Sequence, residues 1–478
     1  MKGTQSARLP LRYLAEQAFS RAAGAPLIPG NSIRLLRDAT ENYPAWLEAI
    51  RSAERWIHFE SYIIANDSTG REFIEALATK ARGGVRVRVV YDWMGTKRYP
   101  WSRFWMPLTQ AGGEIRCFNP PRLDSPLGWL SRDHRKMIAV DGQVGYVTGL
   151  CVSDKWQGDP SRGIDPWRDT GVEVQGPAVC DIERAFAQVW VATGPELPED
   201  ELPDMDCIPA TGETALRVIA TAPNTTGLYR LDQLITALAR QTLWLTDAYF
   251  VGIAPYVQSL CAAASDGVDV RLLVPGASDI PLLKPLTRAG YRPLLESGIR
   301  VFEWNGTMLH AKTGVADGHW ARVGSTNLNL SSWIGNYELD VAVEDERFAQ
   351  AMEQMHREDL SHATEIVLSS KRKLQQTSQI LRQRIRGGRG SSSRAAAGAL
   401  RIANSIGAAI TSKRLLGPAE AKMMGTTGAL LLAIAVIAGI WPMVVAIPLA
   451  LVTGWIAVTF LVKAWRLRRL GKNETHRE

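Results

Sequence analysis

Two stretches of the sequence share one pattern, His134-Arg135-Lys136-Met137-Ile138-Ala139-Val140-Asp141 and His310-Ala311-Lys312-Thr313-Gly314-Val315-Ala316-Asp317. In each stretch a His is followed two positions later by a Lys and seven positions later by an Asp. Only 7 residues are His and 13 of the 55 basic residues are Lys, so composition alone does not account for the repeat. Two His and two Lys brought to one point can attack a phosphodiester, hold its oxygens and protonate the group that leaves.

The sequence around the two patterns repeats as well. An alternating apolar run, a stretch of helical periodicity and a second alternating run precede each pattern in the same order. This order predicts an α/β fold made of two sheet-based halves related by a pseudo-two-fold axis, with the site where the halves meet. The expected elements are strands at 56–64, 84–91 and 113–118 with a helix at 71–82, then strands at 243–250, 267–274 and 298–302 with a helix at 255–265.

Shifts in composition divide the chain further. A Pro- and acid-rich stretch near 197–211 separates the halves, and an Arg-rich stretch from 371 to 414 follows the second half. The N-terminal residues lack the uninterrupted apolar core of a signal peptide, and an amphipathic helix on a membrane surface is one interpretation of them. The predicted organisation is an N-terminal segment (1–30), a first half (31–200), a second half (211–368), a basic linker (369–422), a transmembrane hairpin (423–463) and a basic tail (464–478).

A long uncharged stretch predicts attachment to a membrane. No charged residue occurs in 423–462, which is 40 residues and about 60 Å of helix. One pass through a hydrocarbon core of ~30 Å needs ~20 residues, so two passes with a turn near Trp441-Pro442 fit this length. Basic residues flank both ends, which predicts a hairpin with both of its ends, and the body of the protein, on the cytoplasmic side of the membrane. A buried pair of core helices is the alternative.

Charge is distributed unevenly along the chain. Residues 371–478 hold 18 Lys+Arg and 3 Glu, a net charge of +15, whereas residues 1–370 hold 37 Lys+Arg and 45 Asp+Glu, a net charge of −8. A body that follows DNA phosphates is normally basic, so no nucleic acid is expected as a partner. A basic segment beside a hydrophobic one favours contact with anionic lipid. The 5 Cys form no C-x-x-C pair, which indicates reduced thiols rather than disulfides or a zinc site.

The residue types in the two patterns suit phosphodiester chemistry that needs neither a metal nor another cofactor. A neutral imidazole can form a bond to phosphorus, and a second, protonated imidazole can donate to the leaving alkoxide. Lys136 and Lys312 would neutralise the non-bridging oxygens as negative charge builds in the transition state.

At these residues the chain resembles the phospholipase D superfamily, and within it the bacterial cardiolipin synthases. The resemblance covers roughly residues 28–368 and implies a duplicated phospholipase D fold. Beyond the two patterns it rests on Gly30-Asn31, Trp167-Arg168-Asp169-Thr170, Gly176-Pro177-Ala178-Val179, Gly324-Ser325-Thr326-Asn327 and Asn336-Tyr337-Glu338.

The resemblance implies that one His becomes a phosphohistidine while the other acts first as an acid and then as a base. By analogy with relatives, we assign His134 as the nucleophile and His310 as the acid. Asp141 and Asp317, the last residues of the two patterns, are expected to be structural.

The same resemblance implies a set of supporting residues. Glu338 follows His310 within the same half and is expected to accept a hydrogen bond from that ring, which would fix its tautomer and orientation. Asp169 is expected to serve His134 in the same way. Ser325 and Asn327 are expected to hold the phosphate.

The sequence departs from its relatives at two points. Thr148-Gly149-Leu150-Cys151 stands where relatives have Gly-Gly-x-Asn, so Cys151 replaces an Asn and a hydrogen bond to the phosphate would be lost in this half. The interpretations of Cys151 are a small buried hydrophobe or, alternatively, a nucleophile. Relatives also commonly anchor through N-terminal helices, whereas this chain is expected to anchor through its C-terminal part.

Together these features predict a membrane-attached phosphatidyltransferase. We expect it to transfer a phosphatidyl group from one phosphatidylglycerol to a second phospholipid and so produce cardiolipin, with phospholipids and the membrane as partners. Three alternatives stay open: a phospholipase D that hydrolyses phospholipids, a nuclease of the same superfamily, and a lipid-binding scaffold without catalysis.

Overall fold

The computed structural model describes residues 8–96, 101–121, 131–204, 207–280 and 283–368, together with scattered positions between 432 and 461. The chain divides into two compact units, Met1–Ile366 and Val367–Glu478. Both motifs and all the described strands lie in the first unit.

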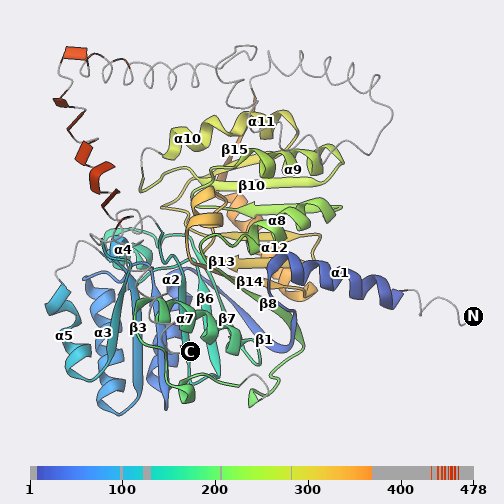
Figure 1. The fold of residues 1–478 in the computed structure, drawn as a ribbon. Coiled ribbons are helices and arrows are strands. Elements are labelled where there is room, and N and C mark those ends of the chain that lie inside the picture. The colour runs from blue at the N-terminus through green and yellow to red at the C-terminus, as the bar shows by residue number, and fades with distance from the viewer. Residues whose placement is uncertain are drawn as a thin grey trace, which may run out of the picture. The chain divides into compact units, whose positions relative to one another are not determined.

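Strands and helices alternate through both halves of the first unit (Figure 1). The described elements of the first half are α1 (Arg8–Ala23), β1 (Ile28–Arg37), α2 (Asp38–Ser52), β2 (Trp56–Ser61), α3 (Ser68–Arg82), β3 (Arg86–Asp92), α4 (Trp93–Thr96), α5 (Trp101–Gln110), β4 (Glu114–Phe118), β5 (Lys136–Val140), β6 (Val144–Thr148), α6 (Asp154–Gln157), β7 (Thr170–Gln175) and α7 (Val179–Thr193). Those of the second half are β8 (Thr214–Thr221), α8 (Gly227–Leu238), β9 (Thr242–Thr246), α9 (Ala254–Ser265), β10 (Asp269–Pro275), α10 (Leu283–Ala289), α11 (Tyr291–Glu296), β11 (Arg300–Trp304), β12 (Thr313–Ala316), β13 (Trp320–Gly324), β14 (Glu338–Val343), α12 (Glu346–Ser361) and β15 (Ala363–Ile366).

The described strands form one sheet of 15 strands in the order β15-β11-β10-β9-β12-β13-β14-β8-β1-β7-β6-β5-β2-β3-β4. Outward from the junction of β1 and β8, the first half runs β1-β7-β6-β5-β2-β3-β4 and the second runs β8-β14-β13-β12-β9-β10-β11. In each half the outer three of these strands are parallel and the inner pairs are antiparallel. The two halves therefore have the same topology, and they join into one continuous sheet.

A short irregular pairing of β1 with β8 joins the halves. Ile28 pairs with Leu216 and Asn31 pairs with Thr214, with a register shift between the two pairs. The buried Asn31 amide donates to the carbonyl oxygens of Ile28 (2.8 Å) and Thr214 (3.4 Å). Its own oxygen accepts from the N–H of Ala178, just before α7, at 2.8 Å. One side chain thus ties the first strand to the second half and to a covering helix.

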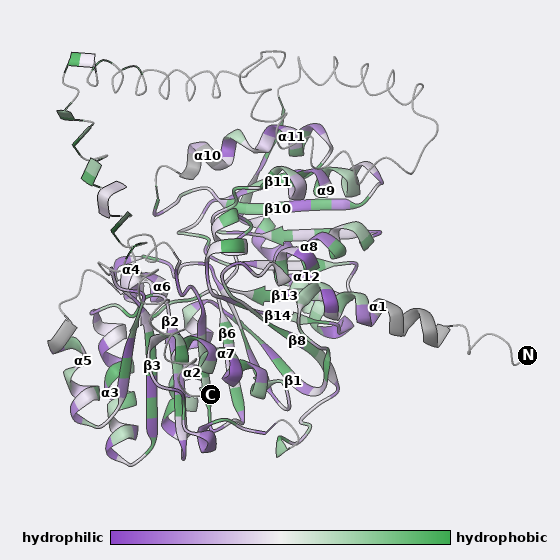
Figure 2. Cartoon of the chain, viewed as in Figure 1, coloured by the Kyte–Doolittle hydropathy of each residue, from purple (hydrophilic) through white to green (hydrophobic). Residues whose placement is uncertain are grey.

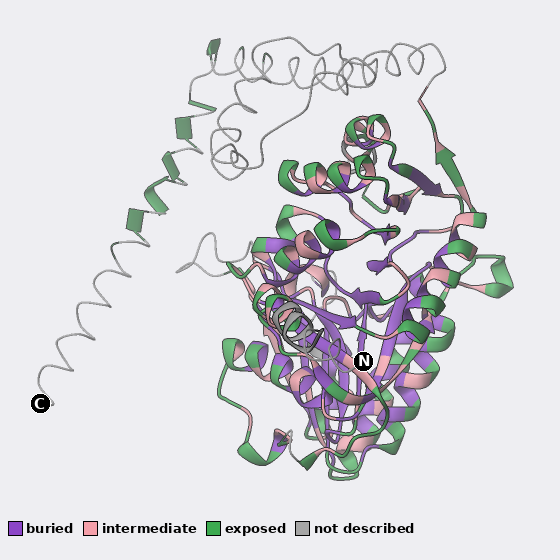
Figure 3. Cartoon of the chain, turned by 90° about the vertical axis from the view of Figure 1, so that its right-hand side faces the viewer, coloured by how far each residue is buried: buried purple, intermediate pink, exposed green. Residues whose placement is uncertain are grey.

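The hydrophobic core lies on both faces of the sheet. One cluster packs α2, α3 and α5 onto the first half, and another packs α8, α9 and α11 onto the second half. A third cluster takes side chains from strands of both halves and from α7 and α12, including Phe186 and Phe348. The two halves therefore share one interior. Strands such as β2, β5 and β14 are buried throughout, whereas β1, β4 and β15 are largely half-buried or exposed. Figure 2 shows both apolar and polar residues along the strands, and Figure 3 shows the buried interior.

The expected strands and helices are confirmed with shifted ends. The helix expected at 71–82 begins earlier, at Ser68, because the Asp67 carboxylate caps it by accepting from the N–H of Gly70. Part of each repeated pattern lies on a strand, but β5 begins at Lys136 and β12 at Thr313, so both His precede their strands.

The N-terminal segment forms α1, and Phe19 and Ala23 contact the core of the second half. In the second unit, the described positions between Leu432 and Leu461 are helical and exposed. Among the residues that the structure describes, no helix is long and apolar enough to cross a membrane. Most of the predicted hairpin at 423–463, the whole basic linker and the whole basic tail lie outside the described residues.

The junction of the halves gives a stability prediction. Replacement of Asn31 by Ala should lower the free energy of unfolding by about 2 kcal/mol, because it leaves buried backbone groups without partners. Thermal and urea unfolding of the full chain measure this change. Asn66→Ala is the matched control, since the Asn66 side chain accepts only from Arg71 near the surface. Equal losses in the two variants would contradict a special role for Asn31.

Candidate active site

Backbone pairing between the halves fixes the position of His134. Its N–H donates to the carbonyl oxygen of Tyr337 at 2.9 Å, and the N–H of Tyr337 donates to the carbonyl oxygen of Arg132 at 2.8 Å. The segment before β5 is therefore paired with the segment before β14 of the other half.

His310 is fixed by the equivalent pairing. Its N–H donates to the carbonyl oxygen of Arg168 at 2.7 Å, and the N–H of Arg168 donates to the carbonyl oxygen of Met308 at 2.9 Å. The segment before β12 is thus paired with the segment before β7. The same hydrogen-bond pattern occurs on both sides of the junction.

Each imidazole is held by a carboxylate from the opposite half. Nδ1 of His134 lies 2.9 and 3.1 Å from the two oxygens of Glu338, and Nδ1 of His310 lies 2.7 Å from Oδ2 of Asp169. The sequence assignment, in which Glu338 served His310 and Asp169 served His134, is wrong. The carboxylates are the predicted ones, but the pairs are crossed.

The topology of the sheet explains the crossed pairs. His134 precedes β5 and Asp169 precedes β7, and β6 lies between these strands. Two strand spacings of ~4.8 Å put the beginnings of β5 and β7 about 10 Å apart. The backbone of His134 pairs instead with Tyr337, the residue before Glu338, so the carboxylate of the opposite half lies beside the ring. The same argument separates His310 from Glu338 in the second half.

The two motif Lys are buried beside the rings. The Lys312 ammonium lies 2.9 Å from Nδ1 and 3.2 Å from Nε2 of His310, and it also donates to the carbonyl oxygen of that residue. The Lys136 ammonium donates to the carbonyl oxygen of His134. Each Lys therefore lies against the His of its own motif.

Burial lowers the pKa of both imidazoles. For His310, burial and then the neighbouring Lys312 lower the pKa to about 3. For His134, burial lowers the pKa, Glu338 opposes this effect, and Lys136 and Lys312 add to it. Lys136 acts on His310 in the same direction from across the junction. The charges of both Lys therefore act on both imidazoles, and both rings are neutral at pH 7.

The two carboxylates are ionised in spite of their burial. Burial alone would raise the pKa of Asp169, but His310 and Lys312 outweigh it and the pKa is lowered. His134 and Lys136 outweigh burial in the same way for Glu338. Burial lowers the pKa of Lys312 to about 8, so its ammonium group loses its proton as the pH rises through about 8.

The last residues of both motifs have the structural role that was expected of them. The Asp141 carboxylate accepts from the N–H groups of residues 54–56 at 2.7 to 2.8 Å, at the start of β2. The Asp317 carboxylate accepts from the N–H groups of residues 240–242 at 2.8 to 2.9 Å, at the start of β9. Both fix the end of a hairpin strand against its neighbour and contact neither imidazole.

The predicted phosphate-binding residues differ in their surroundings. Ser325 donates its hydroxyl proton to Glu338 and accepts from the N–H of Leu339, so it orients the carboxylate and has no proton left for a phosphate. This part of the prediction needs correction. Asn327 is buried, and its Oδ1 has no hydrogen-bond partner among the described residues. A phosphate accepts hydrogen bonds and donates none, so the Nδ2 group of Asn327, and not its Oδ1, would contact it. The phosphate-binding role of Asn327 stays a prediction.

Cys151 lies in the core of the first half. Its side chain is buried in the cluster that contains α2 and α3, and burial raises the pKa of the thiol. A neutral, enclosed thiol is a poor nucleophile, so the surroundings favour the interpretation as a small hydrophobe.

Two tyrosines that the sequence reasoning left unassigned flank the imidazoles. Tyr62 packs edge-on against His134 with ring centroids 5.1 Å apart, and Tyr249 packs edge-on against His310 at 5.7 Å. They follow β2 and β9, which occupy equivalent places in the two halves. A Tyr follows each of the two equivalent strands in the sequence, and this repetition could have identified both residues.

Two buried arginines beside the site residues bind to other parts of the fold, and no role for them was predicted from the sequence. Arg135 donates to the carbonyl oxygens of Glu338 (3.1 Å) and Thr221 (3.0 Å), both in the second half. Arg168 forms a two-point ion pair with Asp359 of α12 at 2.8 Å for each contact. Arg135 lies inside the first motif and Arg168 directly precedes Asp169, so their positions beside the site residues could have identified them.

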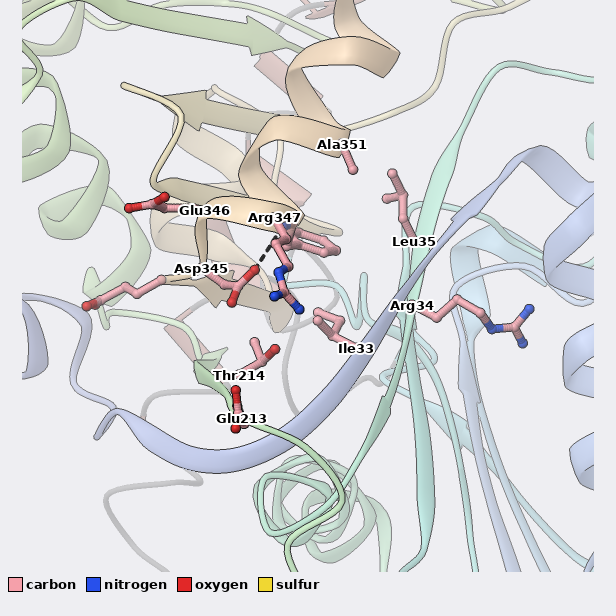
Figure 4. Close-up of a pocket in the computed structure, with 11 residues that line it drawn as sticks. Ile33, Arg34, Leu35, Glu213, Thr214, Asp345, Glu346, Arg347 and Ala351 are labelled. Carbon is pink, nitrogen blue, oxygen red and sulfur yellow. Dashed lines mark hydrogen bonds between the residues drawn. The ribbon is translucent and has the colours of Figure 1, made fainter.

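A separate pocket of about 830 Å³ lies near β1, β8 and the start of α12 (Figure 4). Charged side chains dominate it, and Asp345 caps α12 by accepting from the N–H of Phe348. The motif residues do not line it, so it is no part of the site. Within the described ranges, no group of three or more His, Cys, Asp or Glu is placed to hold a metal ion.

The amino-acid sequence of this chain is similar to those of known proteins. The family model described as "Cardiolipin synthase, PLD-like domain" matches residues 46–190 and 232–360, which include both motifs. The chain belongs to this family of the phospholipase D superfamily. It is therefore an enzyme of the phosphatidyltransferase type, and the resemblance found in the motifs is confirmed.

Individual relatives agree with this membership. A cardiolipin synthase of Staphylococcus aureus is 30% identical over 348 residues, which are 71% of this chain and 69% of the relative. Cardiolipin synthase A of Pseudomonas fluorescens is 30% identical over 385 residues, or 78% of each chain. The crystal structure of phosphatidylserine synthase from Haemophilus influenzae has a TM-score of 0.58 at 13% identity, covering 77% of this chain and 97% of that one, which shows a shared fold.

The crossed pairs give a prediction about single substitutions. Glu338→Gln should change the ring resonances of His134 and leave those of His310 in place, whereas Asp169→Asn should do the reverse. The amide cannot stabilise a charged imidazole, so each variant should lose roughly a thousandfold or more in rate. NMR of the full chain with labelled His, assigned by single His substitutions, measures the first effect. Pairing within each half would give the opposite assignment.

Proposed function

We propose that this enzyme transfers the phosphatidyl group of one phosphatidylglycerol to a second phospholipid, producing cardiolipin through a phosphohistidine at His134. The observation that carries the proposal is the pair of imidazoles, each with Nδ1 on a carboxylate of the opposite half. Nδ1 therefore holds the proton, and Nε2 is available for chemistry. The named cardiolipin synthases among the relatives support the choice of substrate.

In the first step, Nε2 of His134 attacks phosphorus and the bond from phosphorus to the glycerol oxygen breaks. The protonated His310 donates its Nε2 proton to that oxygen, so glycerol leaves neutral. The incoming phosphate brings a negative charge, which raises the pKa of His310 and lets it carry that proton. Lys136 and Lys312 stabilise the charge on the non-bridging oxygens, and Glu338 stabilises the positive ring of His134.

In the second step, the neutral His310 takes the proton of an acceptor hydroxyl. The acceptor oxygen then attacks phosphorus, and the bond from phosphorus to His134 breaks. The side chain of His134 is 11% exposed and that of His310 is 5% exposed. The greater access to His134 and the crowding of His310 by Lys312 support His134 as the nucleophile.

The same two steps with water as the acceptor would make the enzyme a phospholipase D. The proposal places a lipid hydroxyl at this position because the relatives are synthases. Exclusion of water from the phosphohistidine decides between the two products.

We also propose that residues 423–463 form a hairpin in the bacterial inner membrane, with the body on the cytoplasmic side. The uncharged length and the basic residues at both ends support this arrangement. Extraction of membranes with alkaline carbonate tests it: the full chain should stay in the pellet, and a chain that ends at residue 422 should be released. Release of the full chain would contradict the hairpin.

Product analysis tests the function. Purified full-length enzyme in vesicles that contain labelled phosphatidylglycerol should release glycerol and form labelled cardiolipin. His134→Ala and His310→Ala should each reduce this activity by a factor of roughly a thousand or more. His319→Ala is the control, because that side chain is 71% exposed and outside the motifs. Phosphatidic acid as the main product would favour the phospholipase D, and unchanged cardiolipin synthesis in either motif variant would contradict the site.

Lys312 gives a prediction about pH. Its pKa of about 8 means that it is charged below pH 8 and neutral above it, so kcat/KM should fall as pH rises through about 8. Bound phosphate stabilises the ammonium, so the corresponding fall in kcat should occur at higher pH. In Lys312→Arg, which keeps its charge, this fall should disappear from the profile even if the overall rate is lower. A fall that stays at the same pH in that variant would assign it to another group.

A further inference from the structure

The carboxylates that hold the two imidazoles are supported by different donors. Oε2 of Glu338 accepts from Nδ1 of His134 at 2.9 Å and also from the hydroxyl of Ser325. Oδ2 of Asp169 accepts from Nδ1 of His310 at 2.7 Å and also from the indole N–H of Trp156 at 3.1 Å. In both pairs the oxygen that holds the imidazole has a second donor.

Ser325 has no counterpart in the first half. When the two motifs are superposed in sequence, the position equivalent to Ser325 is Gly149. A Cβ at Gly149 would lie 2.2 Å from Oδ1 of Asp169, so no side chain fits there. The N–H of Thr170 donates to Oδ1 of Asp169 at 2.9 Å, so the second donor for Oδ2 must come from another part of the chain.

The loop between β6 and β7 supplies that donor. The stretch from Cys151 to Asp169 is longer than the equivalent stretch from Asn327 to Glu338, so the first half has the longer loop. This loop contains α6, and Trp156 on α6 is buried. The Trp156 ring also meets the His310 ring edge-on, with centroids 5.2 Å apart and planes at 89°.

Short polar contacts hold α6 against the start of α3. The Asp67 carboxylate accepts from the hydroxyl of Ser153 (2.7 Å) and the N–H of Asp154 (2.9 Å). The Asp154 carboxylate accepts from the hydroxyl of Ser68 and the N–H of Thr69, both at 2.8 Å. The indole is thus presented from a fixed support and loses little freedom when it binds Asp169.

We propose that Trp156 is a positioning residue for the acid-base pair Asp169–His310, and that it does in the first half what Ser325 does in the second. The inference rests on the proposed function only for the role of His310. The indole N–H and the imidazole both donate to Oδ2 of Asp169. This second hydrogen bond fixes the orientation of the carboxylate and reduces its attraction for the proton of His310.

The charged groups around Asp169 and His310 determine whether loss of the indole N–H makes the His310 imidazolium more or less stable. His310 faces Asp169, Lys312 and Lys136, and Tyr249 packs on its ring. The N–H of Asp169 donates to Asp38, and the Arg168 guanidinium donates to the carbonyl oxygen of Asp169. Loss of the indole N–H leaves these groups in place, so the negative charge of the carboxylate acts more strongly on His310. The imidazolium then becomes more stable.

The test is Trp156→Phe, which keeps an aromatic ring and removes the donor. In the pH profile of kcat, which reports the protonated His310 of the enzyme–substrate complex, the limb that belongs to His310 should move up by about half a pH unit, because one hydrogen bond to the carboxylate is lost. The Nδ1–H proton of His310 should move downfield in NMR of the full chain with labelled His, while that of His134 stays. The rate of glycerol release from phosphatidylglycerol should fall about tenfold.

Two further variants separate this role from a structural one. Ser325→Ala should move the His134 resonance and leave that of His310. Trp167→Phe removes another indole beside His310, with rings 5.9 Å apart, and should leave the Nδ1–H resonance of His310 in place. In an Asp169→Asn background, Trp156→Phe should cause no further loss of rate.

The proposal is overturned if Trp156→Phe only lowers the melting temperature, or if it moves the resonances of both His alike. It is also overturned if the losses from Trp156→Phe and Asp169→Asn add independently. The NMR shift does not depend on the identity of the product. A shifted His310 in an enzyme that makes no cardiolipin would therefore support the proposal and contradict the proposed function.

Discussion

Each motif imidazole is held by a carboxylate that the opposite half supplies. Unpaired, Glu338 and Asp169 would be ionised groups in a dry interior, which is strongly destabilising. Pairing with His134 and His310 removes that penalty only when the halves are in register. The backbone pairing beside each His, the Asn31 junction and the shared core all keep that register. Neither half contains a complete site.

Local sequence patterns predicted much of the fold. The alternation at 84–91 and the helical periodicity at 71–82 found β3 and α3, because these signals depend on neighbours along the chain. The repeated motif found both His and both Lys. The structural role of Asp141 and Asp317 was also predicted, although it came from family resemblance and not from the pattern itself.

The crossed pairing could not be predicted in this way, because it depends on strand order. Closeness in sequence suggested that Glu338 serves His310, since both belong to the second half. An intervening strand separates them, and each imidazole takes its partner from the other half of the chain. Ser325 was misassigned for a related reason, since a hydroxyl near the site can face either the substrate or a carboxylate. Only coordinates distinguish the two.

The site is asymmetric within its repeated frame. His310 is enclosed by Trp156, Trp167, Tyr249 and Lys312, whereas Tyr62 is the ring contact described for His134. The two-step reaction that we propose needs such a difference, because one ring must approach phosphorus while the other holds and returns a proton. Duplication supplied two imidazoles, and the longer β6–β7 loop makes their surroundings unequal.

The central claim is that the two imidazoles act on one phosphorus atom. A crystal structure of the full chain with orthovanadate, which imitates a five-coordinate phosphorus, tests it most directly. The account predicts one vanadium between the rings, with Nε2 of His134 bonded to it and Nε2 of His310 in hydrogen-bond contact with the oxygen on the opposite side. Vanadium bound at a single motif, with the other imidazole out of reach, would contradict it.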